Sequence, residues 1–324
     1  GAECDFEIVQ TLLESAEAAR ATQQADRALA YSDEGLSTLS SFFKGASRDT
    51  LLSSLDGTQE KVVEVMDGGE ACEKSLDALV TEAQLRQLRG ELLLDLGKLS
   101  EAEQELEIAR TLSVKLCDDV AVGRCLRSEG MRLLMKKELN KAEEKLEAAV
   151  KCCHQAEDPK EEAATLKLLI PLYKATTNRY DRCCECFHQM LEALQAEGDM
   201  EGVSATLLDL GNFRLNRHLN DTTGGSELEF AELEMTDLDL QGALQYYQEN
   251  GGEDPSQLPE VLVSVGTIKM LLGDQAASVA ALEQAKQLYE EQKDDDGVER
   301  ANGLLSDVKR IMDKVDSTSV TPIG

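Results

Sequence analysis

The chain has 324 residues, of which 42 % are hydrophobic and 4 % aromatic, with 5 Pro and no Trp. This apolar share is enough for a sizeable core, and the scarcity of aromatic residues favours helices over sheets. The formal net charge is −30, because 63 acidic residues face 33 Lys and Arg. Such a charge argues against direct binding of nucleic acid or of an anionic membrane surface, and it favours basic partners.

The N-terminal region, residues 1–82, has a less regular pattern than the rest of the chain. Residues 5–43 read as two amphipathic helices, because apolar residues recur there at helical spacing. Breaks follow at Asp56-Gly57 and at Asp67-Gly68-Gly69. We therefore expect an N-terminal helical region over 1–82 that contains one or more diverged repeats.

A repeat with a period of 40 residues follows. The same spacing of small and bulky residues occurs three times, in Gly90/Ala102/Leu106/Ala109, in Gly130/Ala142/Leu146/Ala149 and in Gly266/Ser278/Leu282/Ala285. The glycine predicts a close approach between two helices, and the last three positions share one helix face. Each copy therefore predicts a helix–turn–helix unit, which must stack on its neighbours to bury its apolar stripe.

Two weaker copies and a final helix complete the pattern. The third copy has Pro171 in place of the glycine, followed by Cys183, Phe187 and Met190. The fourth opens at Gly211, and we expect its second helix only at Ala243 and Tyr247. Aspartates at the joints, Asp118, Asp158, Asp199 and Asp294 to Asp296, suit helix starts. The prediction is five hairpins over about 83–300, a capping helix at 301–316 and a frayed tail at 317–324.

The repeated segments resemble the tetratricopeptide repeat (TPR) family, which carries Gly-Tyr in the first helix and Ala, Phe, Ala and Pro along the second. The period of 40 and the joint Gly198-Asp199-Met200-Glu201-Gly202 are similar to the long repeats of kinesin light chains and of spindle-orientation adaptor scaffolds. The Trp, most of the Tyr and the closing Pro of the family pattern are missing. The resemblance implies an all-α fold, a right-handed superhelical solenoid of stacked antiparallel helix pairs.

In this family the first helices of the repeats line a concave groove that binds a peptide or a helix of a partner. Transferred to this sequence, the resemblance implies a partner-binding groove that includes Gln84, Gln87, Glu91, Arg124, Arg127, Ser128, Met131, Asn212, Asn216 and Thr267. The chaperone-binding members clamp a terminal carboxylate with Lys and Asn, whereas Gln87 and Glu91 stand at those positions here. Because Glu91 would repel a carboxylate, acidic chaperone tails are disfavoured as partners.

An acidic segment is expected as an insertion at about 220–240, between the two helices of the fourth repeat. No Lys or Arg occurs between Arg217 and Lys269. Acidic and apolar residues alternate in the segment, among them Glu227, Glu229, Phe230, Glu232, Leu233 and Glu234. Three interpretations stay open: a solvated loop at a tolerant turn, a docking arm for a basic and partly apolar surface, or a pseudo-ligand for the protein's own groove.

Candidate sites for chemistry are weak. Cys152-Cys153-His154 and the stretch from Cys183 to His188 contain zinc-ligand types, but the spacing is not that of a paired CxxC site. Cys183 also occupies the small-residue position of its repeat, where a cysteine packs like an apolar residue. No HExxH, GxSxG or GxxxxGK[ST] motif is present. We therefore predict no enzyme activity, no catalytic residues, no cofactor and no metal.

The sequence favours a non-enzymatic interaction scaffold or adaptor that binds a protein or peptide, with no direct nucleic-acid binding and no membrane insertion. Two alternatives remain: an acidic chaperone for basic proteins such as histones or ribosomal proteins, and a structural subunit of a larger assembly. No secretory signal or stretch long enough to span a membrane is visible. We expect the cytoplasm as the location, with the nucleus as the alternative.

Overall fold

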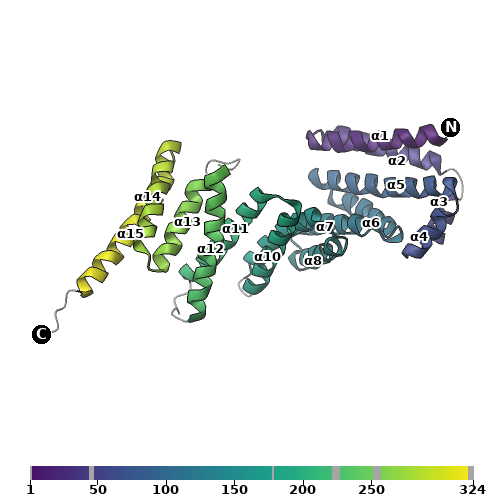
Figure 1. Ribbon diagram of the computed structural model, residues 1–324. Coiled ribbons are helices and arrows are strands. Elements are labelled where there is room, and N and C mark those ends of the chain that lie inside the picture. Colours follow the sequence, from purple (N-terminus) through teal and green to yellow (C-terminus); the bar gives the residue numbers. More distant parts are fainter. Residues whose placement is uncertain (1, 44–46, 177–178, 221–226, 251–256, 320–324) are drawn as a thin grey trace. The chain divides into compact units, whose positions relative to one another are not determined.

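The computed structural model describes residues 2–43, 47–176, 179–220, 227–250 and 257–319, and within them the chain is helical apart from turns (Figure 1). It divides into two compact units, Gly1–Thr176 and Thr177–Gly324, called the N-terminal and the C-terminal unit below. Most consecutive helices pack against each other within each unit. This confirms the expected all-α fold of stacked antiparallel helix pairs. No helix in the described ranges is long and apolar enough to cross a membrane.

The N-terminal unit consists of helical hairpins, with two short helices between the first hairpin and the second. Its helices are α1 (Ala2–Ala21), α2 (Ala25–Phe42), α3 (Ser47–Ser54), α4 (Gln59–Met66), α5 (Glu70–Asp95), α6 (Leu99–Lys115), α7 (Asp119–Met135), α8 (Leu139–Gln155) and α9 (Pro159–Lys174). The pairs α1/α2, α5/α6 and α7/α8 are hairpins, and α1, α5, α7 and α9 contact one another in succession. The first helices therefore share one side of the stack. The boundary drawn at residue 82 lies inside α5.

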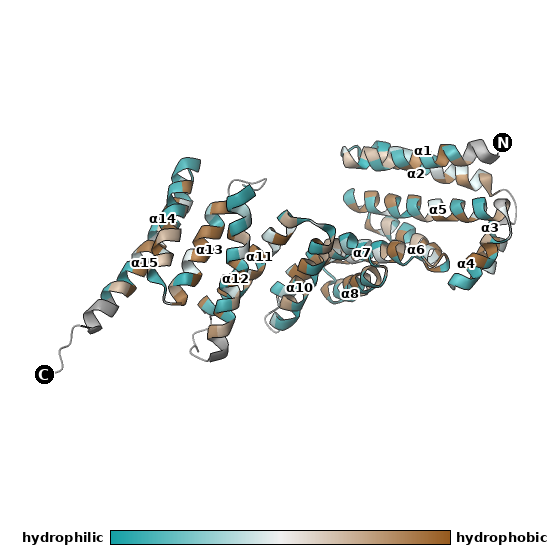
Figure 2. Ribbon diagram, viewed as in Figure 1, coloured by the Kyte–Doolittle hydropathy of each residue, from teal (hydrophilic) through white to brown (hydrophobic). Residues whose placement is uncertain are grey.

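In the C-terminal unit each helix packs against the next one along the chain. Its helices are α10 (Tyr180–Glu197), α11 (Met200–Asn220), α12 (Glu227–Asn250), α13 (Gln257–Leu271), α14 (Gln275–Gln292) and α15 (Asp295–Ser319). Helix α13 is apolar on all sides and is the brownest helix of Figure 2, and its Val261, Leu262 and Ile268 are almost completely buried. It packs on both α12 and α14, so the core of this unit is centred on it.

Each predicted repeat glycine lies against a leucine of the following helix, as the close-approach interpretation requires. The pairs are Gly90–Leu106, Gly130–Leu146, Gly211–Leu240 and Gly266–Leu282. A Cβ built on any of these glycines would lie 2.6 to 2.7 Å from the leucine Cγ or Cδ2, which is closer than real Cβ contacts. The four leucines themselves are fully buried. The prediction from the spacing is therefore confirmed for the hairpins of Gly90, Gly130 and Gly266, and Gly211 makes the same close approach at a different spacing.

The joints between helices are built as the aspartates predicted. The Asp118, Asp158, Asp199 and Asp294 carboxylates each accept a hydrogen bond from the backbone N–H three residues on, at 2.8 to 3.1 Å. These bonds satisfy N–H groups that the first turn leaves unpaired. The residue before each aspartate has a positive φ, including Cys117 at 55° and Glu157 at 54°. Tight connections of this kind bring successive helices into contact.

The fourth repeat differs from the expected arrangement. Its second helix, α12, begins at Glu227, so most of the segment expected as an insertion is helical. Leu240 takes the bulky position, flanked by buried Thr236 and Ala243, and it follows Gly211 by 29 residues where the other three pairs are 16 apart. The expectation that Ala243 and Tyr247 occupy the small and bulky positions of this repeat is therefore wrong, because both residues lie further along α12. The extra length is 13 residues, of which 221–226 lie outside the described residues.

The third repeat is divided between the two units. The first helix of this repeat, α9, belongs to the N-terminal unit and the second, α10, to the C-terminal unit. Cys183, Phe187 and Met190 are buried on α10, as the repeat pattern predicts. The last helix, α15, is longer than the expected capping helix at 301–316, and residues 320–324 of the expected frayed tail lie outside the described residues.

Candidate functional site

The first helices of the N-terminal unit enclose an open hollow of about 550 Å³, called the groove below. Five of the residues expected in the partner-binding groove line it, namely Gln84, Gln87, Glu91, Arg124 and Arg127. The remaining lining residues are Leu13, Glu17, Arg20, Ala21, Leu88 and Glu161. The side chains come from α1, α5, α7 and α9, because every first helix turns the same face to this side of the stack.

Glu91 is the central charge of the groove floor. Its side chain is 11 % exposed and forms an ion pair with Arg20 of α1. Gln87 Nε2 donates to Glu91 Oε1 at 3.1 Å, and the Ser128 hydroxyl donates to the same oxygen at 2.9 Å. Burial alone would raise the pKa of Glu91, but Arg20, Gln87, Arg127 and Ser128 together hold it below its ordinary value. Glu91 is therefore a satisfied carboxylate that ties α1, α5 and α7 together.

Arg124 and Arg127 form the second charged element of the groove. They lie one turn apart on α7, and both approach Glu161 of α9 at 3.2 Å. These contacts lack hydrogen-bond alignment, and the buried Nε atoms of both arginines have no hydrogen-bond partner, nor has Glu161 Oε2. Buried polar atoms are rarely left in this state, so the hydrogen-bonding capacity of the pair is incompletely used within the protein.

The other predicted groove residues play different parts. Ser128 is buried beneath Glu91, and Met131 packs partly against the core around Leu93 and Leu94. In the C-terminal unit, Asn212 Oδ1 accepts from the Ser264 hydroxyl at 2.7 Å, which links α11 to α13. Thr267 is buried and donates to the Val263 carbonyl, and Asn216 is exposed. Whether any of these residues binds a partner stays a prediction.

Two groove elements were missed by the sequence analysis. Leu13, Glu17 and Arg20 come from α1, which shows no repeat pattern strong enough to align with the later copies. Glu161 lies in the first turn of α9, three residues after the joint Asp158, where an acidic residue is expected for the helix dipole alone. A cation such as Arg20 at the end of an amphipathic first helix was the available clue.

The acidic segment is bound into the C-terminal unit by its own charges. Glu232 accepts a hydrogen bond from the Tyr180 hydroxyl and pairs with Arg217 at 3.5 Å. Two more acids of α12 also meet cations, in the pairs Asp237–Lys269 and Asp239–Arg214. Leu233 packs partly against the core. These contacts stabilise the segment as a helix, whereas a solvated loop was one of the three interpretations that the sequence left open.

The outer side of α12 is more apolar than the equivalent helices. Phe230 is 51 % exposed and Leu238 70 %, and Glu234 is exposed between them. The side chains of Glu227 and Glu229 lie outside the described residues. Position 238 is equivalent to Gln104 of α6 and Glu144 of α8, counted from the leucines that face the glycines. The interpretation as a docking arm thus stays a prediction about this face.

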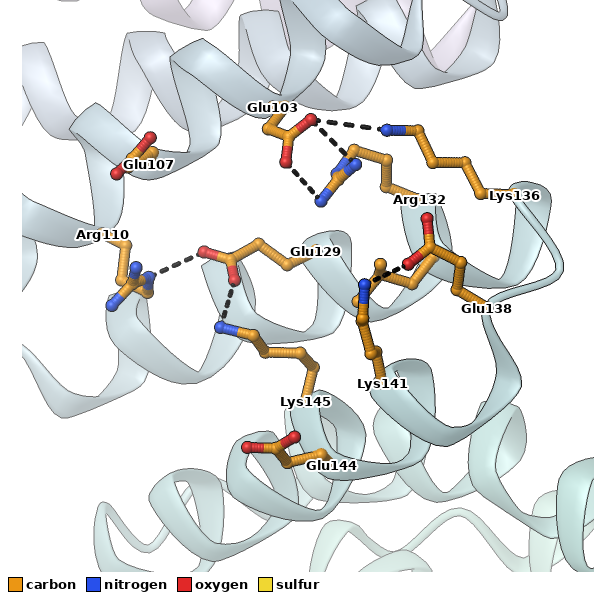
Figure 3. A pocket seen from close by; sticks show the side chains of 11 residues that line it. Glu103, Glu107, Arg110, Glu129, Arg132, Lys136, Glu138, Lys141, Glu144 and Lys145 are labelled. Carbon is orange, nitrogen blue, oxygen red and sulfur yellow. Dashed lines mark hydrogen bonds and ion pairs between the residues drawn. The ribbon is translucent and has the colours of Figure 1, made fainter.

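A second hollow, on α6, α7 and α8, is lined by opposite charges that neutralise each other (Figure 3). Glu129 accepts from Arg110 at 2.7 Å and pairs with Lys145 at 2.8 Å. Glu103 pairs with Arg132 at 2.9 Å, and Glu138 pairs with Lys141 at 2.6 Å. The carboxylates and cations point toward one another in the picture, so this site reads as an ion-pair network between neighbouring helices.

The cysteine clusters are largely part of the packing. Cys153, Cys183 and Cys186 are buried, and burial raises the pKa of Cys153 to about 12. Among the described residues no group of three His, Cys, Asp or Glu side chains could hold a metal ion. His154 contacts Glu162 at 3.2 Å, and His188 lies beside Arg214.

Comparisons with known proteins give the fold and no further assignment. No family model matches the chain, and no curated protein does. BtubC (BKLC) from P. vanneervenii is 15 % identical, with 77 % of this chain and 94 % of that chain covered and a TM-score of 0.51. A Rap protein complexed with competence and sporulation factor is 13 % identical, covers 95 % of this chain and 87 % of its own, and has a TM-score of 0.43. A circular tandem repeat protein is 13 % identical over 98 % of both chains, with a TM-score of 0.29. At such identities the likeness shows a helical-repeat fold alone.

Proposed function

We propose that this chain is a non-enzymatic scaffold of the tetratricopeptide type, with long repeats similar to those of kinesin light chains and spindle-orientation adaptors. It binds a peptide or a helix of a partner protein in the groove of the N-terminal unit. The observation that carries the proposal is the Arg124–Arg127 pair, which lines the open hollow with side chains 40 % and 22 % exposed and whose Nε atoms have no hydrogen-bond partner. A ligand that supplies acceptors there would satisfy them.

The composition of the groove fits a polypeptide better than a small charged metabolite. Gln84 and Gln87 offer both donors and acceptors, as a peptide backbone requires. Leu13 and Leu88 add apolar surface, which contributes affinity that salt does not screen. The charges are balanced, since three arginines face three glutamates, so neither a strongly acidic nor a strongly basic ligand is selected by net charge. Glu91 on the floor supports the expectation that acidic chaperone tails are disfavoured.

The acidic-chaperone alternative receives less support. It was motivated by the net charge of −30 and by the acidic segment. Glu232, Asp237 and Asp239 of that segment are engaged with Arg217, Lys269 and Arg214, so their charge is largely compensated within the protein. A structural subunit that binds partners on the outer helices remains compatible with the fold. We place the protein in the cytoplasm or the nucleus as part of the same proposal.

Selection from a random peptide library displayed on phage tests the groove directly. Intact protein should enrich a family of related peptides, and the Arg124→Ala/Arg127→Ala variant should lose them. Lys141→Ala is the matched control, because Lys141 is an exposed cation of α8 that pairs with Glu138 away from the groove. Peptides that bind the arginine variant and intact protein equally would overturn the proposal. Loss with Lys141→Ala as well would indicate a general charge effect instead.

A further inference from the structure

A third hollow in the N-terminal unit lies where the short helix α4 packs on α5, beside the turn between α6 and α7. This cleft has a volume of about 550 Å³ and is called the α4 cleft below. Its apolar lining includes Val62, Met66, Leu76, Val80 and Leu116. Leu76 and Leu116 are buried, whereas Met66 is 49 % exposed, so the lining extends from the core to the surface.

The rim of the α4 cleft carries charge of one sign. Glu73, Asp77, Asp118 and Asp119 line it, and no Lys, Arg or His lines it among the described residues. Asp118 caps α7 through the Ala121 N–H. Glu73, Asp77 and Asp119 are exposed, and within the described part of the chain none of the three forms an ion pair. This differs from the groove and from the α6/α7/α8 hollow, where acids and cations alternate.

Helix α4 itself is only partly packed. It has no fully buried residue, and it leaves Val63 54 % exposed and Met66 49 % exposed. Its apolar residues exceed what its contact with α5 covers, because Val62 and Val65 alone are packed against the core. An exposed apolar surface beside uncompensated carboxylates favours a ligand that covers the surface from water and also carries positive charge.

We propose that the α4 cleft is a second docking site, separate from the groove, for a partner segment that carries Lys or Arg side chains on an amphipathic helix. The aliphatic stems of such side chains lie along the apolar floor while their cations reach Glu73, Asp77 and Asp119. The charge complementarity selects this occupant. A second copy of the chain is disfavoured by mutual repulsion at a net charge of −30, and nucleic acid is repelled by the rim.

Cys117 provides a reporter inside the α4 cleft. It lines the cleft and is partly exposed, so a reagent can reach its thiol. An amphipathic Lys/Leu model helix should slow the alkylation of Cys117 in the full chain by about tenfold at saturation. Cys184, which lies in the C-terminal unit and is also partly exposed, should keep its rate. A Lys/Ser peptide of equal charge and a Glu/Leu peptide should protect neither thiol.

Two variant pairs separate specific docking from general attraction to an acidic protein. Glu73→Gln/Asp77→Asn should weaken binding of the Lys/Leu helix by about tenfold. The control Glu14→Gln/Glu34→Gln removes two exposed acids of α1 and α2 and should change it little. Met66→Gln should weaken binding, and Leu139→Gln, an exposed apolar residue of α8, should not. All four variants change exposed side chains, so folding is preserved.

The outcomes decide the proposal without reference to the groove. Equal loss in the cleft and control variants, or no protection of Cys117, would overturn it. Sedimentation velocity is the remaining arm: self-association that disappears with Glu73→Gln/Asp77→Asn would assign the α4 cleft to a second copy and would equally contradict a basic partner. Because Arg124→Ala/Arg127→Ala should leave the Lys/Leu helix bound, failure of the groove proposal and failure of this one are distinguishable.

Discussion

The Ser278 hydroxyl on α14 donates a hydrogen bond to the backbone carbonyl oxygen of Gly266 on α13, at 2.6 Å. The short serine side chain can reach the other helix only because both residues are small, so that the two backbones lie close together. Ala102 and Ala142 occupy the equivalent position in two earlier repeats, opposite Gly90 and Gly130. The pairing of a glycine with a small residue is therefore what sets the distance between the helices of a hairpin.

Substitution of Gly266 by Ala should destabilise the C-terminal unit. Its Cβ would lie 2.6 Å from Leu282 Cγ, and overpacking of this kind costs about 1–3 kcal/mol. The gain in helix propensity, about 0.5–1 kcal/mol, offsets part of that. Gly303→Ala on α15 is the control, since nothing lies within 4 Å of its Cβ position, and it should gain stability. Urea unfolding of both variants gives the comparison, and a gain in both would contradict the close-packing account.

Glu91→Gln should lower the free energy of unfolding by about 1–3 kcal/mol at neutral pH, because it removes charge-assisted contacts with Arg20 and Ser128. The pKa of Glu91 is lowered in the folded protein, so its contribution is present above the unfolded pKa of about 4.3 and is lost as the pH falls through the lower folded value. The difference between intact protein and variant should shrink below about pH 4.

The control for the pH series is Glu34→Gln, which changes an exposed carboxylate of α2. It should leave the unfolding free energy nearly unchanged at every pH, since exposed charges contribute little. Urea midpoints at several pH values measure both variants. A Glu91→Gln deficit that grows as the pH falls would be the wrong sign and would contradict the assignment of Glu91 as a buried, ionised anchor.

Glu232→Ala should loosen the start of α12. The residue holds the Tyr180 hydroxyl and Arg217, whose guanidinium lies 3.9 Å from the centre of the Tyr180 ring. Without this anchor the first turns of α12 should show amide hydrogen exchange about tenfold faster, while α13 and α14 keep their protection. Glu283→Ala on α14 removes an exposed acid and is the comparison. Unchanged exchange in α12 would mean that core packing alone holds the helix.

The thiols should react in an order set by burial. Burial raises the pKa of Cys125 and Cys153 to about 12, and acidic neighbours such as Glu91 and Glu161 act in the same direction. Time-resolved alkylation of the native protein, read by mass spectrometry, should therefore label Cys117 before either of them. Labelling of Cys153 as fast as Cys117 would show that α7 and α8 open more readily than their packing implies.

Most of the hairpin architecture could be predicted from the sequence, because the contacts that define a hairpin join residues close together in the chain. Gly130 and Leu146 lie 16 residues apart and touch, and Asp158 caps the helix that it precedes, so spacing alone is informative. The start of α12 could not be predicted in the same way. Its acids Glu232, Asp237 and Asp239 contact Tyr180, Lys269 and Arg214, which are distant in the sequence.

The candidate site was accessible from the sequence only in part. The positions on α5 and α7 follow from the repeat, and Gln84, Gln87 and Arg127 do line one hollow. The contribution of Arg20 did not follow from the repeat, because α1 lacks the glycine and leucine pattern that places the other first helices. Ser128 has the spacing of a groove residue but lies beneath Glu91. A shift of one residue along a helix is enough to turn a side chain from the groove toward the core.

Site-specific photo-crosslinking in extract tests the central claim, that the groove binds a partner protein. A benzophenone amino acid would replace the exposed Gln84 in the groove or Lys141 on α8. The account predicts a small set of partners crosslinked from position 84, retained at about 300 mM salt, where charges are screened beyond about 5–6 Å. These adducts should disappear with Arg124→Ala/Arg127→Ala. The same basic proteins crosslinked from both positions, and lost with salt, would contradict it.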